Sequence, residues 1–286
     1  MVSNGRGDGF FLWLDSFDPH EPWDPPIDYT DLYAVPEYDG RPITWGGGFA
    51  ADWSLAEIRH IRSQYAGTIT LVDRWTGEFL ETVDRLGLLD RTMIIFLSDH
   101  GEPLGEHGII KKVQPWPYDE LSHIPLIVRL PDSIKCKKRS DAFVGTPDIA
   151  PTILSFLGID IPSVMQGTNL LAFGDEPCNS EIGISGFHKR SWSIRDRGWS
   201  YYRWIDTQSS YGSKEKPELY KFVSDFVPPR PSQYTLGDQS ERENLFQDEP
   251  DVTEDLGNRL VGFIRCLSPS PGDLMAKDFM KKRMLL

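Results

Sequence analysis

The chain has 286 residues with 39% hydrophobic and 12% aromatic content, enough for a substantial core in one or two domains. Its formal net charge of −13 argues against general binding to nucleic acid or anionic membranes, although a local positive cleft can still accept an anionic substrate. No apolar run is long enough to span a bilayer, so we expect no transmembrane segment.

The first third of the sequence predicts a strand and a long helix. The apolar run at residues 10–15 indicates a buried strand. Apolar residues at helical spacing then predict a helix between residues 52 and 87, with Asp52 or Ser54 as its N-cap and a possible break near Gly67 or Gly77.

The middle of the sequence alternates between strand and helix signals. Apolar runs predict strands at 93–97 and 124–130, and a helical pattern follows at 148–157. Alternation of this kind is typical of βαβ units, whose strands are parallel. We therefore expect the strand at 93–97 to be a buried parallel strand.

The last third has a different pattern, in which short runs with strand character are separated by turn residues. We expect an antiparallel meander with strands at residues 182–185, 191–195, 199–205 and 218–222. A last helix is expected at residues 250–264.

These patterns together predict an α/β fold. We expect part of a mixed, mostly parallel sheet flanked by helices, followed by a small C-terminal antiparallel sheet with a helix. The corresponding domain prediction is an α/β portion at residues 1–178 and an antiparallel-sheet subdomain at 179–286.

The residues directly after the strand at 93–97 have the chemistry of a metal site. Asp99 and His100 stand where the strand ends, and ligands bind at the carboxyl ends of strands in open α/β sheets. A hard divalent cation prefers carboxylate oxygens, and imidazole suits several metals. We therefore predict that Asp99 and His100 bind a metal ion.

A Gly-rich loop follows this pair and contains His107, Lys111 and Lys112. A lysine ammonium suits a sulfate or phosphate oxygen and the charge that develops on a leaving alkoxide. We expect Lys111 and Lys112 to face an anionic substrate, and His107 either to line the substrate pocket or to brace the loop. We interpret His60 and His123 as structural residues.

Residues 98–112, Ser-Asp-His-Gly-Glu-Pro-Leu-Gly-Glu-His-Gly-Ile-Ile-Lys-Lys, resemble the C-terminal signature of the sulfatases, within the alkaline-phosphatase-like superfamily of metal-dependent esterases. The resemblance covers most of the chain, because further segments match the family in the same order. These segments are residues 10–23, 65–73, 87–92, 124–131 and 148–154.

The resemblance implies a sulfuric ester hydrolase that binds Ca²⁺, with Mn²⁺ as the alternative, through Asp99 and His100. It implies that Lys112, thirteen residues after the metal-binding Asp, contacts the anion. It also implies that His20 contacts the transferred group and helps protonate the leaving oxygen, a task that suits a side chain titrating near neutrality.

The sequence also departs from the family pattern. Sulfatases carry an adjacent Asp pair on their first strand and a nucleophile in Cys/Ser-x-Pro-x-Arg, whose Cys or Ser is oxidised to formylglycine. This sequence contains neither motif. We therefore expect a fragment that resembles the C-terminal part of a sulfatase; the alternatives are one piece of a split enzyme that needs a partner chain, and a stable remnant with a binding role.

Three functions stay open from the sequence. The first is hydrolysis of a sulfated small molecule or glycan, the second is phosphodiester or phosphonate monoester hydrolysis, and the third is non-catalytic binding of a sulfated glycan or partner chain. The three widely spaced cysteines, Cys136, Cys178 and Cys266, favour a reducing compartment such as the cytoplasm, while an N-terminal targeting signal cannot be judged.

Overall fold

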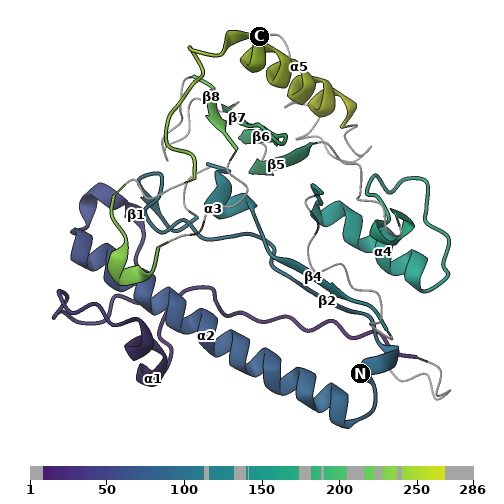
Figure 1. The fold of residues 1–286 in the computed structure, drawn as a ribbon, viewed down its shortest axis with the longest axis horizontal. Helices are drawn as coiled ribbons and strands as arrows, with labels where there is room; N and C mark the ends of the chain where they lie inside the picture. Colours follow the sequence, from purple (N-terminus) through teal and green to yellow (C-terminus); the bar gives the residue numbers. More distant parts are fainter. Residues whose placement is uncertain are drawn as a thin grey trace. The chain divides into compact units, whose positions relative to one another are not determined.

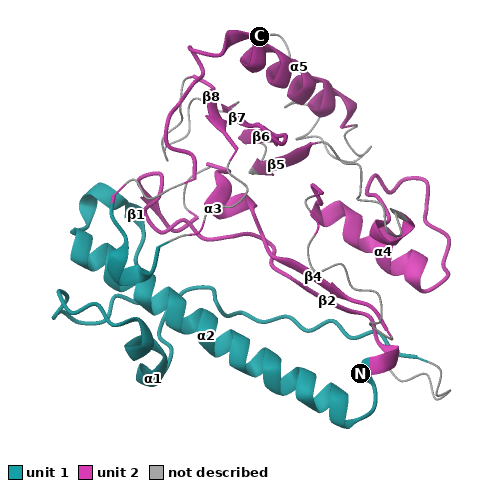
Figure 2. Cartoon of the chain, in the orientation of Figure 1, with its two compact units in different colours: residues 1–89, 229–235 teal, residues 90–228, 236–286 magenta. Residues whose placement is uncertain are grey.

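The computed structural model describes residues 9–112, 116–131, 140, 142–173, 182–187, 190–204, 216–222, 227, 229–236 and 240–267 (Figure 1). The chain divides into two compact units, the first formed by residues 1–89 and 229–235 and the second by residues 90–228 and 236–286 (Figure 2). The domain boundary expected at residue 178 lies outside the described residues and stays a prediction.

The first unit is built on the long helix α2 (Leu55–Arg85). Ser54 is its N-cap: the Ser54 hydroxyl accepts a hydrogen bond from the Glu57 backbone N–H, and the Glu57 carboxylate accepts one from the Ser54 backbone N–H. This capping box satisfies backbone N–H groups that the first turn leaves unpaired, so Ser54, not Asp52, begins the helix. The helix is continuous through Gly67 and Gly77, where the sequence allowed a break.

The apolar face of α2 forms the core of the first unit. Ile58 and Ile61 are almost completely buried. Gly46 lies so close to Ile61 that a Cβ atom at Gly46 would be 2.6 Å from the Ile61 side chain. On the same helix the Arg62 guanidinium stacks over the buried ring of Tyr234 at 4.1 Å, which ties residues 229–235 to α2. The short elements of this unit are α1 (Ile27–Thr30), η1 (Asp31–Tyr33), β1 (Gly48–Phe49), η2 (Ala50–Asp52) and η6 (Pro231–Gln233).

The buried strand expected at residues 10–15 is wrong. These residues form no strand in the described structure, and the Phe11 and Trp13 side chains are 63% and 69% exposed. An apolar run indicates a tendency to burial, but a strand also needs a neighbouring strand for its backbone hydrogen bonds.

The strands expected at 93–97 and 124–130 are present as β2 (Ile94–Leu97) and β4 (Leu126–Arg129), but they pair antiparallel, with Ile94 opposite Arg129. Their side chains are half-buried or exposed. The expected parallel orientation fails because the described part of their connection holds only β3 (Ile109–Ile110) and the four-residue helix α3 (Asp119–Ser122). Parallel strands are usually joined by a crossover α-helix that packs on the sheet, and the described part of this connection contains none.

The second unit ends in the predicted antiparallel meander. Four strands pair in the order β5-β6-β7-β8, and the last helix α5 covers the predicted range. This confirms the α/β class and the small antiparallel sheet. The bounds are β5 (Gly183–Phe187), β6 (Ser191–Arg195), β7 (Trp199–Trp204), β8 (Glu218–Lys221) and α5 (Pro250–Cys266); earlier in the unit lie η3 (Leu89–Arg91), η4 (Thr146–Asp148), α4 (Ile149–Phe156) and η5 (Leu170–Phe173).

Helix α5 packs on the meander through a small apolar core. Leu256 and Leu260 of the helix are almost fully buried against Ile194 of β6 and Leu219 of β8. Burial of a leucine or isoleucine side chain contributes about 1.5–3 kcal/mol each, so this contact stabilises the C-terminal part of the unit. No helix within the described residues is both long and apolar enough to cross a membrane.

Candidate functional site

The predicted metal pair lies in a turn directly after β2. The Ser98 hydroxyl donates to the His100 carbonyl at 2.6 Å, and the Asp99 carboxylate accepts the His100 backbone N–H at 2.9 Å. The Asp99 side chain is 87% exposed. The turn thus presents a carboxylate to solvent at the end of a strand, where an ion can reach it.

The orientation of the His100 ring suits a metal ligand. Its Nδ1–H donates to the Gly101 carbonyl at 2.7 Å, which leaves the lone pair on Nε2. This Nε2 lies 3.6 Å from Asp99 Oδ2, so both atoms face the same space. A carbonyl acceptor on one ring nitrogen commonly sets the tautomer of a metal-binding histidine. The two donors fit part of a Ca²⁺ shell, which takes 6–8 ligands, mostly oxygen.

Gly101 holds this turn against α3. Its backbone N–H donates to the Leu121 carbonyl at 2.7 Å. A Cβ atom at residue 101 would lie 2.1 Å from the Glu120 carbonyl oxygen, far closer than the sum of the carbon and oxygen van der Waals radii. The glycine is therefore required by the close approach of two backbone segments.

Residues 102–112 form a tight hairpin that brings the two lysines back to its base. Lys111 N–H donates to the Pro103 carbonyl at 2.8 Å, and Lys112 N–H donates to the Glu102 carboxylate at 3.2 Å. Gly105 and Gly108 have φ of 107° and 78°, conformations that glycine adopts without strain, and Lys111 has φ of 70°. The fold therefore returns Lys112 to the residue three positions after Asp99.

His20, the remaining predicted site residue, belongs to the first unit. Its backbone N–H donates to the Phe17 carbonyl at 2.9 Å, and its ring Nδ1–H donates to the Glu21 carbonyl at 2.7 Å. The side chain is 34% exposed and its ring centroid lies 4.5 Å from that of Phe17. The peptide bonds before Pro19 and Pro22 are both cis. The hydrogen bonds and the ring contact hold His20 in its loop, and part of its ring is accessible to solvent.

The structure adds a buried cluster at His107 that sequence reasoning missed. His107 Nδ1 lies 2.8 Å from Glu120 Oε1, and Nε2 lies 3.1 Å from the Glu241 backbone carbonyl. The His107 side chain is only 4% exposed. One ligand atom from each of His107, Glu120 and Glu241 falls within 4.8 Å of the others, a spacing that could hold a metal ion.

Buried tyrosines and Arg195 surround this cluster. Glu218 accepts hydrogen bonds from the hydroxyls of Tyr118 and Tyr220, at 2.6 and 2.8 Å. The Tyr202 hydroxyl donates to the Glu241 carboxylate and accepts from the Arg195 guanidinium. Burial raises the pKa of the Glu241 carboxyl, and Arg195 and Tyr202 act against that rise.

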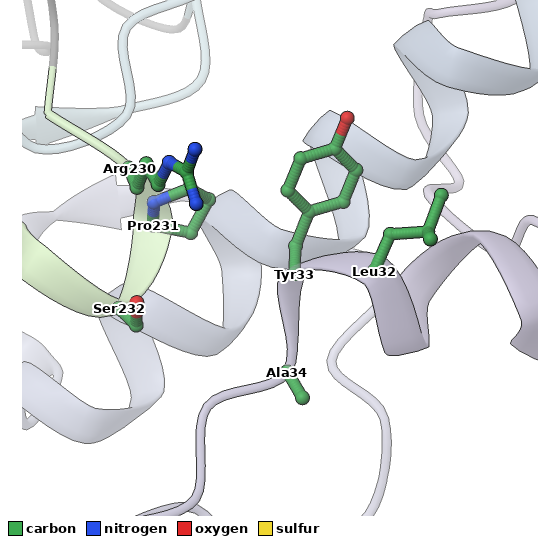
Figure 3. Close-up of a pocket in the computed structure, with 6 residues that line it drawn as sticks. All are labelled: Leu32, Tyr33, Ala34, Arg230, Pro231 and Ser232. Atoms are coloured by element: carbon green, nitrogen blue, oxygen red, sulfur yellow. The ribbon is translucent and has the colours of Figure 1, made fainter.

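A separate hollow lies in the first unit, with a volume of about 390 Å³. It is formed where η1 and η6 meet, and Figure 3 shows the Arg230 and Tyr33 side chains that line it. The hollow is shaped by these residues and their neighbours Leu32, Ala34, Pro231 and Ser232, not by the predicted site residues.

Two family models match the chain. The model described as Sulfatase matches residues 2–159, and the model described as N-sulphoglucosamine sulphohydrolase, C-terminal, matches residues 105–224. Together they cover β2, the turn at Asp99 and the hairpin that ends at Lys112.

Curated relatives carry sulfatase names. An N-acetylglucosamine-6-O-sulfatase of Bacteroides thetaiotaomicron is 41% identical over 106 residues, which cover 37% of this chain and 19% of that protein. Arylsulfatase K of Bos taurus is 28% identical over 256 residues, covering 85% of this chain and 42% of that protein. The chain thus spans less than half the length of these two relatives.

Solved structures agree in fold. One is described as a complex with its substrate D-glucosamine-2-N,6-O-disulfate; it is 26% identical, with a TM-score of 0.57, and the match covers 73% of this chain and 41% of that one. A second, described under glycosaminoglycan metabolism by Bacteroides thetaiotaomicron, is 26% identical with a TM-score of 0.58, covering 84% and 50%.

Proposed function

The chain belongs to the sulfatase family, and from that membership we propose that the protein hydrolyses a sulfate monoester carried by a sugar. A fold alone does not assign a reaction, so the proposal also needs support from the site. Relatives whose names or structures specify sulfated glucosamines support a glycan as the carrier of the ester.

The observation that carries the proposal is the shape of residues 98–112. One turn exposes the Asp99 carboxylate beside the His100 Nε2 atom, and the following hairpin returns Lys112 to Glu102. Two metal donors and a cation that arise from one short segment suit a compact anionic group such as a sulfate ester.

Asp99 and His100 are the residues of this chain that we propose to hold a divalent metal, Ca²⁺ as the sulfatase resemblance implies, with Mn²⁺ as the alternative. When bound, such an ion polarises sulfate oxygens and neutralises part of their charge. His100 contributes through Nε2, because its Nδ1–H is engaged with the Gly101 carbonyl.

The proposed roles of the other residues follow from their charge. Lys112 neutralises a sulfate oxygen, and Lys111 supports anion binding from the same end of the hairpin. His20 donates a proton to the leaving sugar oxygen, since an imidazole can hold a proton near neutral pH. The family's formylglycine is the expected nucleophile, and this sequence contains no Cys/Ser-x-Pro-x-Arg motif to form it.

Titration calorimetry of the chain with Ca²⁺, followed by inorganic sulfate, tests this proposal. We expect Ca²⁺ to bind, and sulfate to bind more tightly when Ca²⁺ is present. D99N should abolish Ca²⁺ binding, whereas D90N, which alters another carboxylate that is 86% exposed, should not. K112M should weaken sulfate binding, whereas K221M on β8 should leave it unchanged.

Three results would contradict the proposal. Ca²⁺ binding that survives in D99N would remove the metal role of that residue. Equal sulfate affinity in K112M and K221M would remove the anion role of Lys112. Preference for inorganic phosphate over sulfate at the same site would favour the phosphoester-hydrolysing relatives of the superfamily instead.

A further inference from the structure

The hydrogen bonds of His107 constrain its protonation. Both ring nitrogens face oxygen atoms: Nδ1 faces the Glu120 carboxylate at 2.8 Å and Nε2 faces the Glu241 backbone carbonyl at 3.1 Å. A carbonyl oxygen and a carboxylate only accept hydrogen bonds. A neutral ring has a single N–H, so one of its nitrogens would oppose an oxygen lone pair unless Glu120 carried a proton.

We propose that His107 carries a proton on both ring nitrogens and that Glu120 and Glu241 hold it as a buried cation. The ring lies flat on Tyr118, with centroids 3.7 Å apart and planes at 8°, a stacking that favours a cation over a neutral ring. Tyr220 of β8 meets the ring edge-on at 6.0 Å. The ring is therefore in direct contact with the Glu120 carboxylate, the Glu241 backbone carbonyl and two tyrosine rings.

The charge of the surroundings supports the same assignment. Several carboxylates and one guanidinium gather around the ring, so a second cation brings the buried cluster closer to neutrality. These groups are Asp119, Glu120, Glu218, Glu241 and Arg195. Burial raises the pKa of the Glu120 carboxyl, while the neighbouring His107 opposes that rise by favouring the carboxylate.

This cation is a positioning residue for the hairpin. His107 lies near the tip of residues 102–112 and anchors it to Glu120 of α3. At the base, Gly101 N–H is bonded to the Leu121 carbonyl of the same helix. Helix α3 therefore holds both ends of the segment. The contact between His107 and Glu120 thereby fixes Lys112 relative to Asp99. The importance of this placement for substrate rests on the proposed function.

The test of the protonation state is nitrogen NMR of the ¹⁵N-histidine-labelled chain at about pH 7.5, above the usual histidine pKa of about 6.5. We expect one histidine with protons on both ring nitrogens, and its signals should vanish in H107Q. In E120Q the ring should become singly protonated. E120D should retain the doubly protonated ring, as should E218Q, which removes the buried carboxylate bonded to Tyr118 and Tyr220.

Hydrogen exchange tests the positioning role. The amides of Gly105 and Lys111 close the hairpin and should exchange about tenfold faster in E120Q than in E218Q or the wild type. Sulfate affinity in the presence of Ca²⁺ should fall in E120Q and recover in E120D. If the wild type binds no sulfate, the proposed function fails. The NMR and exchange results still decide whether the His107 cation holds the hairpin to Glu120.

Two outcomes overturn the assigned protonation state, and a third removes the positioning role. A singly protonated His107 in the wild type would mean that Glu120 carries the proton and that the pair is neutral. A stoichiometric metal ion in the purified chain that is lost in H107Q but not in D99N would mean that the cluster is a metal site. Unchanged exchange at Gly105 and Lys111 in E120Q would remove the positioning role.

Discussion

Replacement of Arg195 by leucine should be among the most destabilising single changes in the second unit. The guanidinium is buried and donates to Ser122 Oγ and the Tyr202 hydroxyl, each at 2.6 Å. It also lies 3.9 Å from carboxylate oxygens of both Asp119 and Glu241. Burial alone would lower the pKa of this guanidinium, but Tyr202, Glu241 and Asp119 together raise it above its usual value.

The size of the destabilisation follows from the carboxylates that lose their ion-pair partner. R195L leaves the buried Glu241 carboxylate and the half-buried Asp119 carboxylate without their guanidinium, and loss of one partner of a buried ion pair costs about 3–5 kcal/mol. With a urea slope of about 2 kcal/mol per molar, the unfolding midpoint of this unit should fall by about 2 M. Urea unfolding followed by tryptophan fluorescence measures the change, because Trp192, Trp199 and Trp204 lie in the same sheet.

The matched control is R203L on β7, a half-buried arginine of the same sheet, which should cost about 1 kcal/mol or less. Adding E241Q to R195L should recover part of the loss, since it removes one of the unpaired charges. A loss below about 1 kcal/mol in R195L, or no recovery in the double variant, would refute the reasoning that Arg195 compensates these carboxylates.

Three further changes test other parts of the fold. Burial lowers the pKa of His60, so the unfolded chain binds more protons than the folded chain between the two pKa values. The contribution of His60 to stability is therefore full above about pH 6.5, its unfolded pKa, and falls as the pH drops through the folded-state pKa. Urea titrations at about pH 5 and 7.5 should show a pH dependence of stability that H60Q reduces. S54A should cost about 1 kcal/mol through loss of the α2 cap, measured by urea unfolding, and an unchanged midpoint would contradict the capping role. G101A should destabilise the second unit by about 1–3 kcal/mol because its Cβ would meet the Glu120 carbonyl, whereas G77A, in open space within α2, should be neutral or stabilising in the same assay; equal effects would argue against the close approach.

Local sequence signals predicted those elements whose determinants are local. The alternation and turn residues after residue 182 predicted the meander, and the Asp196 turn shows why: its carboxylate accepts the backbone N–H groups of Gly198 and Trp199, both at 2.8 Å. The helix α2 was predicted because its apolar spacing and its cap are both contained in one segment.

Features that depend on a distant partner were not predictable in this way. The apolar run at residues 10–15 indicated burial, but nothing in it specifies the strand that must pair with it. The orientation of β2 against β4 depends on their connection, which the apolar runs themselves do not encode.

The residues of the candidate site differ in the same way, between those in one local motif and those that depend on distant partners. Asp99, His100 and Lys112 lie within one motif and could be proposed from the sequence. The partners of His107 could not, because Glu120 lies 13 residues and Glu241 lies 134 residues away. Glu241 stands in a polar segment whose composition indicates a loop, so no local pattern distinguishes it from a solvated surface acid.

Amide NMR of the ¹⁵N-labelled chain, titrated first with Ca²⁺ and then with sulfate, tests the central claim most directly. The account predicts that Ca²⁺ shifts the resonances of Asp99 and His100, and that sulfate then shifts Lys111 and Lys112 in the Ca²⁺-loaded chain. Shifts confined to other segments, or sulfate shifts that persist in D99N and K112M, would contradict the assignment of residues 98–112 as the metal and anion site.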